Sequence, residues 1–284
     1  RWTMFALWFV AVAVHAQDLA LQPVPVAPNV YAVVGDLGGQ TYENDGLNNN
    51  LGFVVSDGGV LVINSGPSVR VARALHAAIR KTTPQPVKWL VNLNSQNHNW
   101  LGNGYFKSLG VTILASSEAE RVMRELGAQQ LDANKTLLKE KADGTVLVYP
   151  TELTADRREL KLGKTAAQLL YFGPAHTPGE LAVWLPRQKI LFAGDLVYTE
   201  RMLAVIPMGN TTNWVRAFDK LAALNPKTIV PGHGRPTTID GARRDTRDYL
   251  TFLLAGAKRV LEAGGSLQDA VEKTDQSRFR SLAN

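Results

Sequence analysis

Short hydrophobic runs separated by polar turns alternate with stretches whose apolar positions recur at helical spacing. Strands are predicted at 30–34, 51–55, 60–63, 89–91, 112–115, 169–172, 181–185, 190–193 and 228–230. Helices are predicted at 71–80, from a capping box at Ser117 and Glu120, and at about 213–224 and 239–263. Strands interleaved with helices in both halves predict an α/β fold, with two helix-covered sheets in one domain of two pseudo-equivalent halves.

Composition excludes several classes of protein. The 284 residues include no cysteine, which rules out a disulfide framework, a thiolate zinc site, an iron–sulfur cluster and a cysteine nucleophile. The formal net charge is only +6, and no Arg/Lys-rich run is interleaved with aromatic residues. We therefore expect no nucleic-acid partner.

The start of the chain has the pattern of a secretory signal peptide. Arg1 precedes an unbroken apolar run from Met4 to Val14, and Val14-His15-Ala16 resembles a small-residue cleavage site before Gln17. A run of this length is too short to span a bilayer, which needs about 20 residues. We expect a signal peptide at 1–16, a mature domain at 17–284 without a membrane span, and secretion, in a bacterium to the periplasm.

Three residues that can bind metal ions follow predicted strands. His176 lies in a His-Thr-Pro-Gly turn, Asp195 follows Gly194, and His233 lies in Pro-Gly-His-Gly. In α/β folds the loops after strands form the functional sites. Each turn alone has an ordinary structural explanation, but the three in this order predict a site.

The order of these motifs resembles the C-terminal half of the metallo-β-lactamase superfamily, and the resemblance extends over about residues 29–263. It implies a four-layer αββα sandwich with a metal site at one edge of its two sheets. By this resemblance, His176 and His233 would each bind one of two metal ions, usually zinc, and Asp195 would bridge them. Many members are hydrolases.

The main signature of that family, His-x-His-x-Asp-His, is absent from the loop after strand 89–91. When the loop is aligned on Gly102 and Asn103, the four signature positions are Ser95, Asn97, Asn99 and Trp100. The Asp that usually follows the early strand is replaced by Asn64. Neutral amides are poorer zinc ligands than imidazole or carboxylate. Trp100 is interpreted as filling the volume of the lost second metal, with a substrate-stacking platform as the alternative.

His98 offers a further imidazole. It lies one residue from position 97, so in an extended loop it would face away from the site, whereas a shifted register would return it. His176, Asp195 and His233 equal the ligand count of a catalytic zinc site or of a two-His-one-carboxylate iron site. Because the two histidines serve different metals in the family, both would have to move closer to bind one ion.

Three hypotheses follow for function. The first is an exported protein of hydrolase lineage whose dinuclear site is lost or reduced to at most one ion. The second is an active mononuclear zinc or iron enzyme using His176, Asp195 and His233, with His98 as a further candidate. The third is a non-catalytic periplasmic binding or accessory protein. Loops 36–39 and 48–50 are interpreted as surface loops that can flank the cleft. The sequence names neither the small-molecule ligand or substrate nor the oligomeric state.

Overall fold

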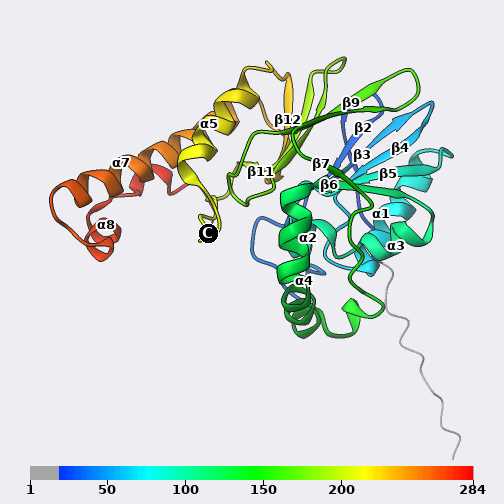
Figure 1. The fold of residues 1–284 in the computed structure, drawn as a ribbon, viewed down its shortest axis with the longest axis horizontal. Coiled ribbons are helices and arrows are strands. Elements are labelled where there is room, and N and C mark those ends of the chain that lie inside the picture. Colours follow the sequence, from blue (N-terminus) through cyan, green and yellow to red (C-terminus); the bar gives the residue numbers. More distant parts are fainter. Residues whose placement is uncertain (1–18, 284) are drawn as a thin grey trace, which may run out of the picture.

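The structure is a computed structural model that describes residues 19–283. The predicted signal peptide at 1–16 lies outside the described residues. Within the described part, two sheets and their helices form a mixed α/β fold, as the sequence predicted (Figure 1).

The first sheet has seven strands in the order β1-β2-β3-β4-β5-β6-β7. They are β1 (Val24–Ala27), β2 (Val30–Val33), β3 (Leu51–Ser56), β4 (Gly59–Ile63), β5 (Val87–Val91), β6 (Thr112–Ser116) and β7 (Glu152–Thr154). Strands β1 to β4 pair antiparallel, and β4 to β7 pair parallel. Strands β3 and β4 form a hairpin, in which Ser56 pairs with Gly59 across the turn.

The second sheet has five strands in the order β12-β11-β10-β9-β8. They are β8 (Arg157–Lys161), β9 (Ala166–Tyr171), β10 (Leu181–Leu185), β11 (Ile190–Tyr198) and β12 (Thr228–His233). Only β11 and β12 pair parallel in this sheet. The carboxyl ends of these two neighbouring strands therefore lie at the same edge of the sheet.

The helices are α1 (Val69–Thr82), α2 (Asn97–Trp100), α3 (Asn103–Ser108), α4 (Ser117–Leu138), α5 (Thr211–Ala222), α6 (Ile239–Ala242), α7 (Asp248–Glu262) and α8 (Leu267–Lys273). Short 3₁₀ helices cover Lys139–Ala142 and Ser277–Phe279. The single helix predicted at 239–263 is instead α6 and α7 joined by a π-helical segment, Arg243–Arg247.

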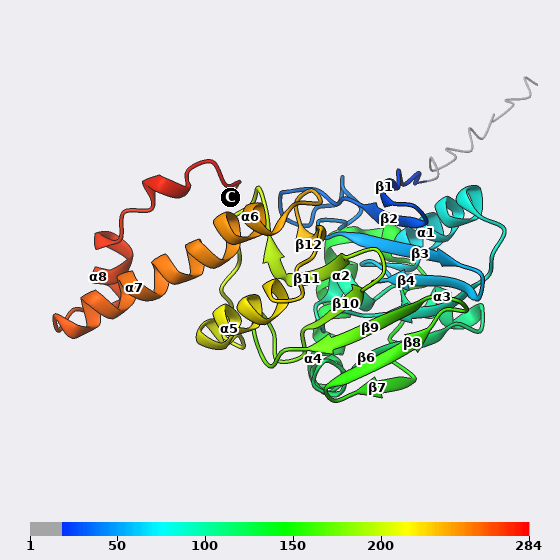
Figure 2. The ribbon, with the colours of Figure 1, turned by 90° about the horizontal axis from the view of Figure 1, so that it is seen from above.

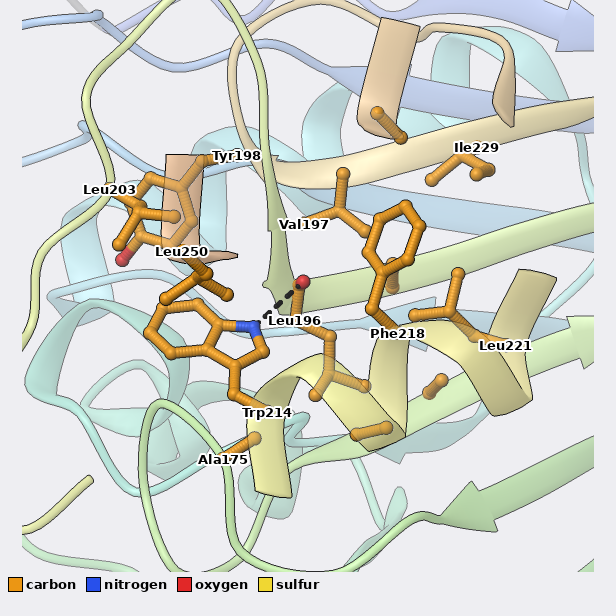
Figure 3. Close-up of a cluster of buried hydrophobic side chains, with 14 of the residues drawn as sticks. Ala175, Leu196, Val197, Tyr198, Leu203, Trp214, Phe218, Leu221, Ile229 and Leu250 are labelled. Carbon is orange, nitrogen blue, oxygen red and sulfur yellow. Dashed lines mark hydrogen bonds between the residues drawn. The ribbon is translucent and has the colours of Figure 1, made fainter. Parts of the chain in front are cut away.

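Hydrophobic side chains define the layers of the fold. Along β4, Leu61 and Ile63 join the core between the two sheets, and Val60 and Val62 join the core beneath α1 and α3. This alternation is the two-residue period of a strand that is buried on both faces. A third core packs α5 and α7 on the second sheet, where Trp214 donates from Nε1 to the carbonyl of Leu196 at 3.0 Å (Figure 3). The layers are thus helix, sheet, sheet and helix.

The C-terminal part of the chain extends from this sandwich. Helix α7 leads away from the sheets, α8 lies at its far end, and the chain then returns towards the second sheet (Figures 1 and 2). Ala283 receives a hydrogen bond from the amide of Met202 and donates one to the carbonyl of Glu200, both at 2.9 Å. The returning segment is therefore joined to the loop that follows β11.

Two local expectations differ from the structure. The side chain that caps α4 belongs to Ser116, not Ser117: its hydroxyl accepts the amide of Ala119 at 3.0 Å. Strands β1, β7 and β8 were not predicted, because their partly exposed residues give little hydrophobic contrast.

Candidate metal site

Neighbouring strands of the second sheet place two of the candidate ligands. Asp195 lies within β11, and His233 is the last residue of β12, which pairs parallel with it. Gly232 makes this close approach possible, because a Cβ there would lie 2.0 Å from Asp195 Oδ1. The parallel register and one glycine thus bring His233 beside the carboxylate.

Three imidazoles surround the Asp195 carboxylate. His233 Nε2 lies 3.4 Å from Oδ1, while His98 Nε2 and His176 Nε2 lie 3.7 and 3.9 Å from Oδ2. All four residues are buried, with His98 the most exposed at 6%. The structure therefore brings together the three residues predicted after strands and adds His98.

The tautomer of His233 is fixed by the backbone of another loop. Its Nδ1 lies 2.6 Å from the carbonyl oxygen of Asn48, an acceptor, so Nδ1 carries the proton and donates it. The Nε2 lone pair then faces Asp195 Oδ1. Burial is the main cause that lowers the pKa of His233 to about 4, against the raising effect of Asp195. At neutral pH a lone pair and a carboxylate oxygen face each other, an arrangement that a cation between them would stabilise.

His98 reaches the site from α2. Gln96 is extended and Asn97 starts the helix, so the loop turns and directs His98 towards Asp195. His98 Nε2 is buried and has no hydrogen-bond partner among residues 19–283. Ligand-type atoms of His98, Asp195 and His233 all lie within 4.8 Å of one another. Two ligand atoms at about 2.1 Å from one tetrahedral ion are about 3.4 Å apart, and the separations of 3.4 and 3.7 Å from Asp195 to His233 and His98 are close to this value.

His176 is held differently. Its Nδ1 lies 2.9 Å from the carbonyl oxygen of Ala204, and its Nε2 lies 2.9 Å from Gln96 Oε1, an amide oxygen that can exchange places with the NH₂ group. Burial is the main cause that lowers its pKa. A neutral His176 that donates from Nδ1 accepts at Nε2 from the Gln96 amide when its NH₂ group faces the ring. Both ring nitrogens of His176 are therefore already engaged.

Asn94 contacts the carboxylate directly. Its Nδ2 donates to Asp195 Oδ2 at 2.7 Å and lies 3.3 Å from Glu180 Oε2. Its Oδ1 accepts from the backbone amide of Gln96 at 2.9 Å and from the side chain of Asn99. Because a backbone N–H can only donate, Asn94 must turn its NH₂ group towards Asp195.

The two buried carboxyl groups differ in pKa. Burial raises the pKa of Asp195, but attraction to His233 and to His176 and His98, when these are protonated, outweighs burial and holds it well below its usual range. Burial and repulsion from Asp195 raise the pKa of Glu180 well above its usual range. Thr177 donates to Glu180 from its amide at 3.0 Å and its hydroxyl at 2.7 Å. Asp195 is thus the more readily ionised of the two carboxyl groups.

The residues aligned with the family signature lie in separate surroundings. Ser95 Oγ is buried without a hydrogen-bond partner among the described residues, and Asn97 donates to Gln40. Trp100 stacks on Tyr149 and donates from Nε1 to Ser95 and Gln130. Its bulk therefore lies on the α4 side of the loop and does not fill a metal position, contrary to our interpretation of Trp100.

The side chains that contact the ligands come from other positions of the same loop. Asn94 touches Asp195, and Gln96 touches His176. Asn99 reaches Asp195 only through Asn94. The sequence did not predict the helical turn that begins at Asn97. Where this turn begins decides which side chains of the loop point in the same direction.

The loop at 48–50 was also misjudged. Asn48, Asn49 and Asn50 are buried rather than exposed, at 6, 1 and 4%. Asn50 donates to the carbonyls of Pro231 and Gly234, at 2.9 and 2.7 Å, and so fixes the turn that carries His233. Three successive asparagines were a signal that could have been used, since buried amides are retained where they are hydrogen-bonded. Asn64, at the end of β4, accepts the amide of Leu93 at 2.9 Å and so supports the start of the loop.

Known proteins share this fold. Residues 98–233 match the model of the Metallo-beta-lactamase superfamily. A metallo-beta-lactamase from Pontibacter korlensis superposes with a TM-score of 0.67 at 20% identity, covering 81% of this chain and 99% of that one. The chain thus shares the metallo-beta-lactamase fold, and residues 98–233 resemble that superfamily in sequence.

Two proteins similar in sequence to this chain have different named activities. The 2,4-dinitroanisole O-demethylase subunit alpha of Nocardioides sp. (strain JS1661) is 24% identical over 63% of this chain and 51% of that protein. The linear primary-alkylsulfatase of Pseudomonas sp. (strain ATCC 19151) is 23% identical over 76% of this chain and 48% of that protein. The chain thus spans about half the length of these two relatives. Within residues 19–283, no helix is long and apolar enough to cross a membrane.

Proposed function

We propose that the chain is a protein of metallo-hydrolase lineage that holds a single divalent ion, zinc or iron(II), between His98, Asp195 and His233. The observation that carries the proposal is the convergence of these ligand atoms within 4.8 Å, with His98 Nε2 buried and lacking a hydrogen-bond partner among the described residues. His176, one of the ligands expected from the sequence, is replaced in this set by His98.

The donor set suits such an ion. Two imidazoles and one carboxylate match the protein ligands of a catalytic zinc site and of the non-haem iron triad. The carbonyl of Asn48 fixes the His233 tautomer so that Nε2 is free to coordinate, as second-shell partners of metal-bound histidines commonly do. Asp195 supplies the one negative charge among the three ligands.

A divalent ion at this position would act as a Lewis acid that lowers the pKa of a water molecule and polarises the bond to be cleaved. The protein's own residues hold the ion, exclude bulk water and orient the carboxylate through Asn94. The named activities of the relatives range from ether demethylation to sulfate ester and β-lactam chemistry, so the substrate is not part of this proposal.

The burial of the site favours a second candidate function, a binding or accessory protein with a structural metal ion. His98, His176, Asp195 and His233 are each at most 6% exposed, which restricts access for a substrate. Metal-dependent hydrolysis of generic ester, lactam or sulfate ester substrates supports the enzyme. Bound metal without any such turnover supports the accessory protein.

We also propose that residues 1–16 are a cleaved signal peptide and that the mature protein is periplasmic. The apolar run and the small-residue cleavage pattern support this. When the gene is expressed with its own N-terminus, a periplasmic protein whose mass begins at Gln17 is expected. A cytoplasmic protein that retains residues 1–16 contradicts it.

Metal analysis of the purified chain tests the metal site. After loading with zinc or iron(II) and desalting, we expect about one ion per chain in the wild type. His98→Ala and His233→Ala should each lose it, whereas His176→Ala should retain it. His76→Ala is the matched control, because His76 is a partly buried histidine on α1 that bonds Tyr105 at 2.9 Å.

Two results contradict the proposal. A folded wild type without metal indicates that no ion is held between His98, Asp195 and His233. Metal that is lost in His176→Ala but kept in His98→Ala assigns the ion to the ligand set expected from the sequence.

A further inference from the structure

Two atoms that a second cation would need, His176 Nε2 and Asp195 Oδ2, each contact a side-chain amide. The Gln96 amide lies 2.9 Å from His176 Nε2, and the Asn94 amide lies 2.7 Å from Asp195 Oδ2. Both amides come from the segment between β5 and α2. Each amide therefore engages an atom whose lone pair a second cation would need.

We propose that Asn94 and Gln96 occupy the place of a second metal ion and thereby restrict this centre to one. The inference rests on the proposed function, since it assigns the other half of the same site. It gives a reason why the site would hold one metal ion and not two: the atoms on the His176 side of the site are engaged in hydrogen bonds with side-chain amides.

The orientation of Asn94 carries this argument. The backbone amide of Gln96 donates to Asn94 Oδ1, so Asn94 presents N–H, not oxygen, to Asp195. A metal ligand must offer a lone pair, and an N–H donor offers none. The hydrogen bond is to Asp195 Oδ2, which lies 3.9 Å from His176 Nε2 and 3.7 Å from His98 Nε2.

More distant amides hold this orientation. Asn99 donates from its side chain to Asn94 Oδ1, and Asn49 donates to Asn99 Oδ1 at 2.9 Å. The chain of donors therefore runs in one direction, from Asn49 through Asn99 and Asn94 to Asp195. Reversing Asn94 would break its bonds with Gln96 and Asp195 together, and buried polar groups without partners are costly.

Imidazoles at the same two positions would convert the cluster into a ligand set. The Nδ1 atom of a histidine lies at the same distance along the side chain as the amide nitrogen of an asparagine, and histidine Nε2 reaches about as far as the glutamine amide. Asn94→His and Gln96→His would therefore direct two lone pairs towards His176 and Asp195. Three imidazoles and a carboxylate oxygen are a suitable donor set for zinc.

The test measures zinc per chain in the Asn94→His/Gln96→His double variant after loading and desalting. We expect a gain of about one equivalent over the wild type, and loss of that gain when His176→Ala is added. Asn97→His is the control, because it adds an imidazole to the same loop at a side chain that bonds Gln40. It should gain no zinc.

The zinc content of the wild type and the additional zinc in the double variant test two separate statements. A wild type without zinc overturns the proposed single-ion site, but the gain of one equivalent still tests the amide inference. A folded double variant with no gain, or a gain in Asn97→His, overturns the inference.

A second double variant tests the same inference with side chains of unchanged shape, in case the two histidines prevent folding. Asn94→Asp/Gln96→Glu keeps both side-chain shapes and adds two negative charges beside Asp195, which only a cation can compensate. We expect zinc to raise the thermal midpoint of this variant more than that of the wild type. An equal shift in both proteins contradicts the inference.

Discussion

The two walls of the site present opposite chemistry to the same carboxylate. The C-terminal wall, formed by Asp195, His176 and His233, carries the charge and two imidazoles on or after strands. The N-terminal wall, residues 94–98, presents the amides of Asn94 and Gln96 and the imidazole of His98 from a loop and a short helix. Strand pairing fixes the positions on the first wall, whereas the second wall follows its loop.

This difference shows how a metal site can change without a change of fold. On the loop, an amide and an imidazole of similar reach can exchange a donor for an acceptor while the backbone stays in place. On the strands, Gly232 leaves no space beside Asp195 even for a Cβ. We therefore expect altered metal stoichiometry in this fold to arise mainly from the N-terminal wall.

The largest effect on stability is expected from Trp100→Ala. This variant tests whether Trp100, next to the N-terminal wall, serves packing alone or also metal binding. Trp100 is fully buried and stacks on Tyr149 with ring centroids 5.6 Å apart. Its truncation should lower the free energy of unfolding by about 3–5 kcal/mol. Because the ring lies on the α4 side of the loop, the folded variant should retain the wild-type metal content.

Urea unfolding and metal analysis of the same preparation check this prediction. Trp100→Phe keeps an aromatic ring but loses the hydrogen bond to Gln130. Its free energy of unfolding should lie between those of the wild type and Trp100→Ala. Full stability together with altered metal content would mean that Trp100 faces the ions.

The next effect is a pH dependence on the C-terminal wall. The pKa of His233 is about 4 in the folded chain, against 6.5 for an ordinary histidine. The unfolded chain therefore binds the extra proton between these values, and stability falls as the pH is lowered from 6.5 to 4. The metal-free protein should lose up to about 3 kcal/mol over this range, since one pKa unit corresponds to about 1.4 kcal/mol.

Unfolding of chelator-treated protein at several pH values measures this loss. His233→Asn should flatten the slope between pH 4 and 6.5, while His76→Ala should leave most of it. The lowered pKa of His176 acts in the same direction, so some slope will persist in the first variant. A profile that is flat in the wild type contradicts the prediction.

The sequence predicted the C-terminal wall more fully than the N-terminal wall. A turn motif at the end of a strand gives both the position and the direction of one side chain, which is why Asp195 and His233 could be placed near each other. The helical turn at Asn97 has no strong signal in a stretch of small polar residues, so the direction of each loop side chain could not be predicted. An extended loop would have turned His98 away from the site.

The fold was predictable to a similar extent. Buried strands such as β4 and β10 are apolar at nearly every position, and their contrast with the turns marks them. Partly exposed strands and the π-helical segment at Arg243–Arg247 lack such contrast, and tertiary pairing decides them. The buried loop at 48–50 depends on contacts with His233 and Asn99, which are far away in the sequence.

The smallest effect on folding is expected from Asp195→Asn. This variant also distinguishes most clearly between the contribution of the carboxylate to stability and its contribution to metal binding. The new amide oxygen can accept from Asn94, and the new NH₂ group can donate to the His233 lone pair, so both hydrogen bonds suit the geometry. Without metal, the variant should equal or exceed the wild type in stability by up to about 1 kcal/mol, because it removes a buried charge. Loss of the charged ligand should weaken metal binding by about 100-fold or more.

Thermal unfolding with and without zinc measures both effects in one experiment. The zinc-induced rise in midpoint should disappear in Asp195→Asn, while the midpoint without zinc is kept. Asp45→Asn is the matched control, since Asp45 is also buried but pairs with Arg70 at 2.8 Å. That variant should be less stable and yet keep its response to zinc. If Asp195→Asn instead loses stability without metal and responds to zinc normally, the carboxylate serves the fold rather than the ion, and the chemical difference between the walls has no bearing on metal binding.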